Sequence, residues 1–284
     1  MRQNAHTAGP AGGGAAHEYC GAIDFGGTKT LVGIVNRGGS IVASKRFETD
    51  KAGTPQAHFA ACSALLRGLL NELELSDKEI AGIGVTVPGL ADAGRGVLLH
   101  APYLGWKDVP VAELLRQYWH VPLIAIANDV NACALAESMF GAAPDVRNLL
   151  WVTVSTGIGG GLIADGRICE GENGLAGEIG HVVVEWQDGA PCGCGNRGCL
   201  EVHASGTAIA AAGRQAYAAA DAGSPLRLRF AAESDITAQS LAAAAQDGVE
   251  EARRLFRDAG EYLGRALPPP STCSIPAQSS SAAE

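Results

Sequence analysis

The sequence predicts an α/β protein with two lobes of related construction. Residues 19–39 and 148–166 share one pattern: an apolar strand, a turn rich in glycine and threonine, a return strand and a polar glycine turn. Patterns typical of amphipathic helices come after both segments. The chain has 284 residues, 47% of them hydrophobic, enough for a sizeable core and two lobes. A weak internal duplication accounts for these observations.

The first lobe is expected over residues 18–127 and opens with a β-meander whose turns are rich in glycine. Strands are predicted for residues 19–24, 30–35, 40–47, 80–87 and 121–127. Apolar side chains at helical spacing predict a helix over residues 56–74, and a second helix is expected over residues 109–119.

The second lobe is expected over residues 128–267. Helices are predicted for residues 131–140, 205–220 and 241–267, and residues 224–234 are interpreted as a loop or a short extended piece. Strands are predicted for residues 148–154 and 162–164, on either side of a glycine turn at residues 155–161.

Both ends of the chain are expected to be disordered tails, over residues 1–17 and 268–284. The first is rich in alanine and glycine without an apolar segment. The second begins with three prolines, which end the last helix, and continues with almost no apolar side chains.

Composition excludes several classes of function. The formal net charge of −9 argues against nucleic acid as a main partner, because phosphate backbones require a basic face. The chain has no run of about 18 apolar residues, so no membrane span is expected. The eight cysteines occur without a secretory signal and are interpreted as thiols of a cytoplasmic protein.

The densest cluster of chemically active side chains lies between residues 177 and 201. It contains His181, Cys192, Cys194 and Cys199, and three thiolates with one imidazole are a common ligand set for structural zinc. Glycines between the cysteines allow a turn tight enough for all three sulfurs to reach one ion. The alternative interpretation is a loop with reduced thiols and no metal.

The two glycine turns are candidates for binding phosphate. Residues 25–29 come directly after Asp24 and offer backbone N–H groups together with the hydroxyl of Thr28. The spacing is not that of a P-loop, and a plain hairpin would produce the same pattern. For residues 155–161 the alternative is a flexible glycine loop. Two such turns could hold the phosphates of a nucleotide between the lobes.

Asp129 lies after a predicted buried strand and before a predicted helix. Ligands of α/β folds bind at the carboxyl ends of strands, where a carboxylate can act as a general base. An aspartate in this position can equally be an ordinary helix N-cap. Position alone leaves both interpretations open.

In combination, these motifs resemble the ROK family of sugar kinases and repressors, and in particular its bacterial glucokinase branch, over roughly residues 22–267. Asp24 to Lys29 and Ser155 to Gly161 resemble its two phosphate motifs. Glu178 to His181 is similar to its Glu-x-Gly-His motif, and Cys192 to Glu201 to its Cys-x-Cys-Gly-x-x-Gly-Cys-x-Glu motif.

The resemblance implies a duplicated actin-like (ribonuclease-H-like) fold with the active site between the lobes, the second lobe here being incomplete. It implies ATP-dependent phosphorylation of a hexose, glucose first, with Asp129 as the general base. Sugar-binding residues implied are Gly89, Asn128, Glu178, His181 and Glu201. Zinc is implied at His181, Cys192, Cys194 and Cys199, and ATP with magnesium at Asp24, Gly26, Gly27, Thr28, Lys29, Thr156, Gly157 and Gly159. A homodimer or larger homo-oligomer is also expected.

Two departures from the family pattern affect these expectations. Tyr103 stands where the glucokinases carry a sugar-contacting asparagine. The proline run and serine-rich tail replace a strand, an adenine-contacting glycine turn and a closing helix, as a truncation or a shifted reading frame would do. One alternative is therefore a sugar-binding remnant without kinase activity. A ROK transcriptional regulator is a second alternative, disfavoured because only 23 residues precede Asp24 and none of them resemble the helix-turn-helix domain that such regulators carry there.

Overall fold

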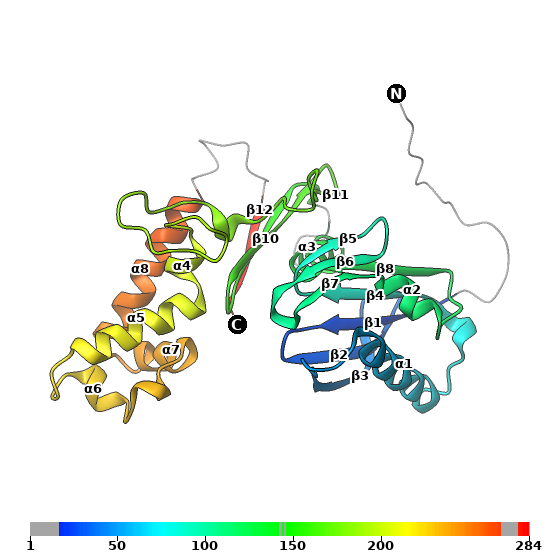
Figure 1. Ribbon diagram of the computed structural model, residues 1–284, viewed down its shortest axis with the longest axis horizontal. Coiled ribbons are helices and arrows are strands. Elements are labelled where there is room, and N and C mark those ends of the chain that lie inside the picture. The colour runs from blue at the N-terminus through cyan, green and yellow to red at the C-terminus, as the bar shows by residue number, and fades with distance from the viewer. Residues whose placement is uncertain (1–16, 142–143, 145, 268–277, 284) are drawn as a thin grey trace. The chain divides into compact units, whose positions relative to one another are not determined.

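The computed structural model describes residues 17–141, 144, 146–267 and 278–283 (Figure 1). Of the expected N-terminal tail, residues 1–16 lie outside the described residues. The chain divides into two compact units, the first ending at Asp129 and the second beginning at Val130. This division falls two residues after the end of the first lobe expected from the sequence.

The first unit contains a five-stranded sheet in the order β3-β2-β1-β4-β8. Its strands are β1 (Tyr19–Phe25), β2 (Lys29–Asn36), β3 (Ile41–Glu48), β4 (Ile80–Val87) and β8 (Leu123–Asn128). β1, β2 and β3 form an antiparallel meander, while β4 pairs parallel to β1 and β8 parallel to β4. The three parallel strands therefore end at the same edge of the sheet.

Two helices and a small second sheet complete this unit. Helix α1 (Pro55–Glu72) begins after Thr54, whose side chain accepts a hydrogen bond from the backbone N–H of Ala57. Helix α2 spans Val111–Arg116, shorter than the expected range 109–119. The small sheet has the order β5-β6-β7, formed by β5 (Leu90–Asp92), β6 (Val97–Ala101) and β7 (Trp106–Val109). Buried side chains of α1, α2 and both sheets share one hydrophobic core.

The second unit contains a four-stranded sheet in the order β11-β10-β9-β12. Its strands are β9 (Leu149–Val154), β10 (Ile158–Ala164), β11 (Arg167–Ile168) and β12 (Gln278–Ala283). β9, β10 and β11 form an antiparallel meander, and β12 pairs parallel to β9. The order repeats that of the first four strands of the other sheet, so the predicted duplication is seen in the topology.

β12 corrects the expectation of disorder across residues 268–284. Residues 278–283 pair with β9 over its whole length, whereas residues 268–277 and 284 lie outside the described residues. The composition of this segment misled the prediction, because a parallel ladder is held by backbone groups that serine and alanine carry like any other residue.

The helices of the second unit differ from the sequence expectation in four places, one of which is a short helix at residues 201–204 that was not predicted. They are α3 (Asp129–Phe140), α4 (Glu201–Ala204), α5 (Gly206–Ala219), α6 (Pro225–Arg229), α7 (Ala238–Gln246) and α8 (Glu250–Ala266). The single helix expected over residues 241–267 is two helices, because Gly248 has φ +96° and interrupts the helical path. The expected loop 224–234 contains α6, whose N-cap is Ser224. α3 begins at Asp129 rather than at residue 131.

The second glycine turn is shorter than expected. Only residues 155–157 lie between β9 and β10, and the next glycines along the chain belong to β10. The reason is packing against α3: a Cβ on Gly161 would lie 2.5 Å from the Cβ of Ala134, and one on Gly159 would lie 2.8 Å from Val130. These glycines permit the close approach of a helix rather than the flexibility of a turn.

Candidate functional site

The carboxyl ends of β1, β4 and β8 bring together four positions of the first unit. The register pairs Asp24 with Thr86 and Val87 with Asn128. The hydroxyl of Thr86 donates to Oδ1 of Asp24 at 2.6 Å, and Nδ2 of Asn128 donates to the carbonyl oxygen of Gly89 at 3.1 Å. Three residues predicted from the sequence thus lie at one edge of the sheet, where α/β folds bind ligands.

Thr86 is a residue that sequence reasoning missed. It holds the exposed carboxylate of Asp24 in place. Its position one residue before the end of a predicted strand, parallel to the strand of Asp24, was the available signal. The pairing of the two strands, however, is a property of the folded sheet.

Asp129 comes directly after β8 and is the first residue of α3. It therefore lies inside the first helical turn rather than at an N-cap preceding residue 131. A carboxylate in the first turn interacts favourably with the helix dipole. The position at the end of a strand agrees with the requirement for a general base, and its catalytic role stays a prediction.

The first glycine turn connects β1 to β2. The N–H of Gly26 donates to the carbonyl oxygen of Lys29 at 3.0 Å, which closes the turn. Thr28 and Lys29 are exposed, so their polar groups are accessible to a ligand. Binding of phosphate by this turn, with Gly27 at its centre, stays a prediction.

The second glycine turn contacts Glu201, a residue predicted to bind the sugar. The N–H of Ile158, next to Gly157, donates to Oε2 of Glu201 at 3.0 Å. The hydroxyl of Thr207 donates to the carbonyl oxygen of Thr156 at 2.7 Å. The carboxylate of Glu201 therefore lies next to the turn predicted to bind phosphate. The sequence does not indicate this proximity, because Ile158 and Glu201 are 43 positions apart.

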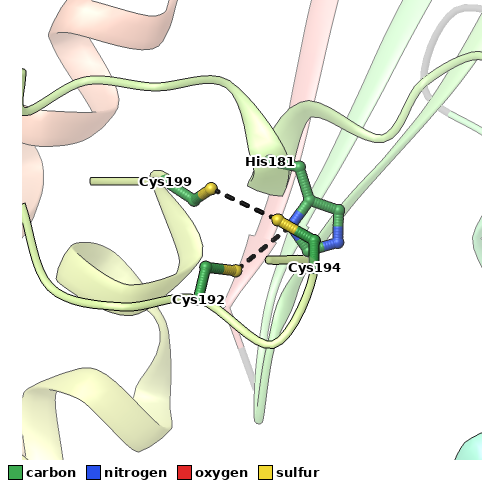
Figure 2. Close-up of side chains that lie close together, drawn as sticks. All are labelled: His181, Cys192, Cys194 and Cys199. Carbon is green, nitrogen blue, oxygen red and sulfur yellow. Dashed lines mark hydrogen bonds between the residues drawn. The ribbon is translucent and has the colours of Figure 1, made fainter. Parts of the chain in front are cut away.

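His181, Cys192, Cys194 and Cys199 converge as one cluster, which Figure 2 shows. Their ligand atoms all lie within 4.8 Å of one another. Nδ1 of His181 lies 3.5 Å from Sγ of Cys192, and the sulfurs of Cys194 and Cys199 are 3.6 Å apart. Zinc–sulfur bonds of about 2.3 Å in a tetrahedron require sulfur–sulfur edges of about 3.8 Å, so the observed separations fit a tetrahedral metal.

The thiols of the cluster differ in acidity. Burial and the neighbouring thiols raise the pKa of Cys199 to about 12. In contrast, a backbone hydrogen bond from Asn196 lowers the pKa of Cys194. Three crowded sulfurs do not all ionise readily by themselves, and a metal ion supplies the positive charge that holds them as thiolates. The donor set and the spacing therefore fit a metal.

His181 reaches the cluster through a short 3-10 helix, η3 (Ile179–His181), which comes after the exposed Glu178. The N–H of His181 donates to the carbonyl oxygen of Glu178 at 3.1 Å. Since Nδ1 faces the sulfurs, Nε2 is the ring nitrogen left for another partner. A backbone hydrogen bond thus links Glu178, which is predicted to bind the sugar, to His181, which is predicted to bind the metal.

Comparison with known proteins relates this architecture to sugar kinases. A glucokinase of Halalkalibacterium halodurans is 34% identical over 245 residues, covering 86% of this chain and 74% of that protein. A crystal structure of a ROK family glucokinase from Streptomyces griseus, in complex with glucose and AMPPNP, has a TM-score of 0.75 at 29% identity, covering 93% of this chain and 83% of that one.

A ROK family transcriptional regulator, a homologue of the E. coli MLC protein, is also similar, with a TM-score of 0.77 and 27% identity over 87% of this chain and 61% of the regulator. Fold and relatives together indicate the sugar-kinase class of enzyme. The family model for ROK proteins matches residues 20–269, and the chain belongs to the ROK family. Among the described residues, no helix is long and apolar enough to cross a membrane.

Proposed function

We propose that the chain phosphorylates a hexose hydroxyl with ATP as phosphate donor, and that glucose is the first sugar to test. The observation that carries the proposal is the gathering of Asp24, Gly89 and Asn128 at the carboxyl ends of three parallel strands. A solved ROK relative with the same fold holds glucose and AMPPNP. Phosphoryl transfer depends on positioning and charge neutralisation, which these groups and the glycine turns can provide.

In this proposal Asp129 accepts the proton of the attacking sugar hydroxyl. Asn128 and Gly89, joined by a hydrogen bond, orient the sugar. Glu178, His181 and Glu201 are assigned to sugar hydroxyls. Asp129 is partly exposed, between the end of β8 and the first turn of α3. A carboxylate in this position can contact a bound alcohol and accept its proton.

The phosphate groups are assigned to the two glycine turns. Backbone N–H groups of residues 27–29 and of residues 156–157 bind the nucleotide phosphates, with Gly26 and Gly159 flanking these groups. Asp24, held by Thr86, is the carboxylate available for the magnesium ion that accompanies ATP. Magnesium supplies positive charge to the phosphates when it is bound.

Zinc is the metal proposed for the cluster of His181 and the three cysteines. Zinc supplies rigidity there when it is bound. The consequence for the sugar site is an imidazole whose Nδ1 faces the metal position and whose Nε2 is left for another partner. Cytoplasmic location and assembly as a homo-oligomer complete the proposal, and light scattering of the purified chain measures the latter.

A coupled assay of ADP release over a panel of hexoses tests the proposal. The panel contains glucose, fructose, mannose and N-acetylated hexosamines, because Tyr103 leaves the choice of sugar open. We expect hexose-dependent ADP release with glucose among the substrates. A folded sample that releases no ADP with any of these sugars contradicts the proposal.

A sugar sensor without turnover is the second candidate, favoured by the similarity to the ROK regulator. Calorimetry with glucose and with Mg-ADP separates the two candidates. Binding of sugar without binding of nucleotide supports the sensor, while binding of both supports the kinase.

A further inference from the structure

A chain of buried hydrogen bonds ends at the first glycine turn. Six polar side chains are buried in the described part of the chain, and three of them, Thr30, Thr49 and His58, contact one another. Nε2 of His58 lies 3.1 Å from Oγ1 of Thr30, which lies 2.9 Å from Oγ1 of Thr49. Oγ1 of Thr49 donates to the carbonyl oxygen of Gly26 at 2.8 Å.

The direction of this chain of hydrogen bonds is fixed by its last member. A carbonyl oxygen only accepts, so the hydroxyl proton of Thr49 is directed to Gly26. Thr49 can then only accept from Thr30, and Thr30 can only accept from His58. The chain is therefore satisfied throughout when Nε2 of His58 carries a proton, and every donor points toward the turn.

The imidazole at the far end is fixed by aromatic packing. The ring centroid of His58 lies 4.4 Å from that of Phe25 in an edge-on arrangement, and 5.9 Å from that of Trp106. Burial lowers the pKa of His58, against the opposing charge of Asp50. A neutral ring held by aromatic side chains can keep one N–H directed at Thr30.

Thr49 holds the turn through its backbone as well. Its N–H donates to the carbonyl oxygen of Thr28 at 2.9 Å, while its hydroxyl holds the carbonyl oxygen of Gly26. Thr49 therefore fixes two peptide units of the turn, those that join residue 26 to residue 27 and residue 28 to residue 29. Their N–H groups, on Gly27 and Lys29, are assigned to phosphate. The C=O and N–H of a trans peptide unit point in opposite directions. Because both carbonyl oxygens are held toward Thr49, the two N–H groups are directed away from it, where a phosphate can bind.

We propose that the hydrogen-bond chain of His58, Thr30 and Thr49 positions the first glycine turn for the phosphates of the nucleotide. The three residues are positioning residues, since none is assigned a contact with substrate. This inference rests on the proposed function, because it assigns the ligand of the turn to be a nucleotide. It adds a part of the nucleotide site that lies in the core, on β2, on α1 and at the end of the meander.

The test compares Thr49→Val with Thr49→Ser by calorimetry with Mg-ADP. Valine removes the hydroxyl that holds Gly26, and serine retains it. We expect the Kd for Mg-ADP to rise about three- to tenfold in Thr49→Val, the range that loss of one buried hydrogen bond gives. Thr49→Ser restores nearly native affinity, and the Kd for glucose stays unchanged in both variants.

The matched control is Ser63→Ala. Ser63 is buried on the same helix as His58, and its hydroxyl oxygen has no hydrogen-bond partner among the described residues. We expect this variant to bind Mg-ADP as the native chain does. If Thr49→Val does not fold, His58→Leu and His58→Gln repeat the comparison, because glutamine retains an N–H donor and leucine does not.

Three outcomes overturn the inference: unchanged Mg-ADP affinity in the folded Thr49→Val variant, equal weakening of Mg-ADP and glucose binding, or absence of Mg-ADP binding by the native chain. The equal weakening would indicate a merely structural role. A native chain that binds Mg-ADP but phosphorylates no hexose contradicts the proposed function alone, and leaves the comparison of Thr49 variants fully interpretable by binding.

Discussion

The two units share a sheet order and differ in the segment that comes after the meander. In the first, β3-β2-β1-β4 is extended by β8, and α1 comes after the meander. In the second, β11-β10-β9-β12 has the same order, and the segment with the cluster of His181 and the three cysteines comes next. The repeated part, the meander, carries the glycine turns. The part that differs carries α1 in the first unit and the cluster of His181 and the three cysteines in the second.

The two units also stabilise their turns differently. The first turn is held from the core, by Thr49 directly after β3, and a large aromatic cluster surrounds that network. The second is held by Glu201 and Thr207, which come after the cysteine segment. The first turn therefore depends on burial, while we expect the second to depend on a segment that a bound metal stabilises.

Replacement of Asp129 by asparagine has the largest expected effect. Asp129 is the residue at which the first unit ends, and asparagine retains its shape without the capacity to accept a proton. We expect kcat to fall by about 10²- to 10⁴-fold, the usual contribution of a general base, with glucose affinity little changed. Steady-state kinetics and calorimetry on the same preparation provide the two measurements. A variant that retains full turnover excludes Asp129 as the base.

Removal of the metal should affect the two units differently. Zinc contributes on the order of 10 kcal/mol to small metal-folded peptides, so a chelator should unfold the cysteine segment while the first sheet stays intact. Hydrogen exchange measured by mass spectrometry compares residues 182–200 with β1 and β4.

Cys199→Ser should reproduce the effect of the chelator, and Cys20→Ser, which removes an exposed thiol of the first unit, should not. Equal loss of protection in both units would contradict the proposed difference between them. So would a purified chain that contains no bound metal and still protects residues 182–200.

A glycine-to-alanine pair tests packing in each unit. Gly161→Ala places a methyl group 2.5 Å from Ala134, and we expect a loss of about 1–3 kcal/mol in the free energy of unfolding. Gly68→Ala in α1 meets no heavy atom within 4 Å, and we expect a gain of up to about 1 kcal/mol. Denaturant unfolding measures both. A destabilised Gly68→Ala variant would contradict the packing described for α1.

The smallest expected effect is on the pH dependence of stability. Burial lowers the pKa of His58 in the first unit and of His203 in the second. The unfolded chain therefore binds protons near pH 6.5 that the folded chain does not, so stability present above that pH is lost as the pH falls below it.

Thermal unfolding of the native chain and of His58→Gln between about pH 7.5 and about pH 5 measures this dependence. The variant should lose less stability across the range than the native chain, because one of the two imidazoles with a lowered pKa is gone. An identical slope in both proteins would show that folding leaves the pKa of His58 unchanged, and would contradict the lowered pKa.

The sequence predicts well those features that local patterns encode. Alternating apolar residues and glycine turns placed β4 at residues 80–87 with both ends correct, and the spacing of His181 and the cysteines indicated a cluster that the structure assembles. Helix α5 was expected within one residue at each end, since Ser205 is a strong N-cap. These features depend on neighbours in the chain.

Features that depend on distant pairing were missed. β12 has no apolar pattern and exists through its backbone ladder with β9. The hydrogen bond of Thr86 with Asp24 and that of His58 with Thr30 join residues separated by 62 and by 28 positions, and no local pattern indicates them. Gly159 and Gly161 were expected in a turn because glycine in a sequence does not reveal whether it permits a bend or a close packing contact.

Phosphoryl transfer to a hexose by this ROK chain is tested most directly by mass spectrometry of the products formed from glucose and ATP. We predict a hexose monophosphate in the reaction with the native chain and none with Asp129→Asn. A folded, metal-loaded native chain that binds glucose and Mg-ADP but yields no hexose monophosphate would contradict this prediction.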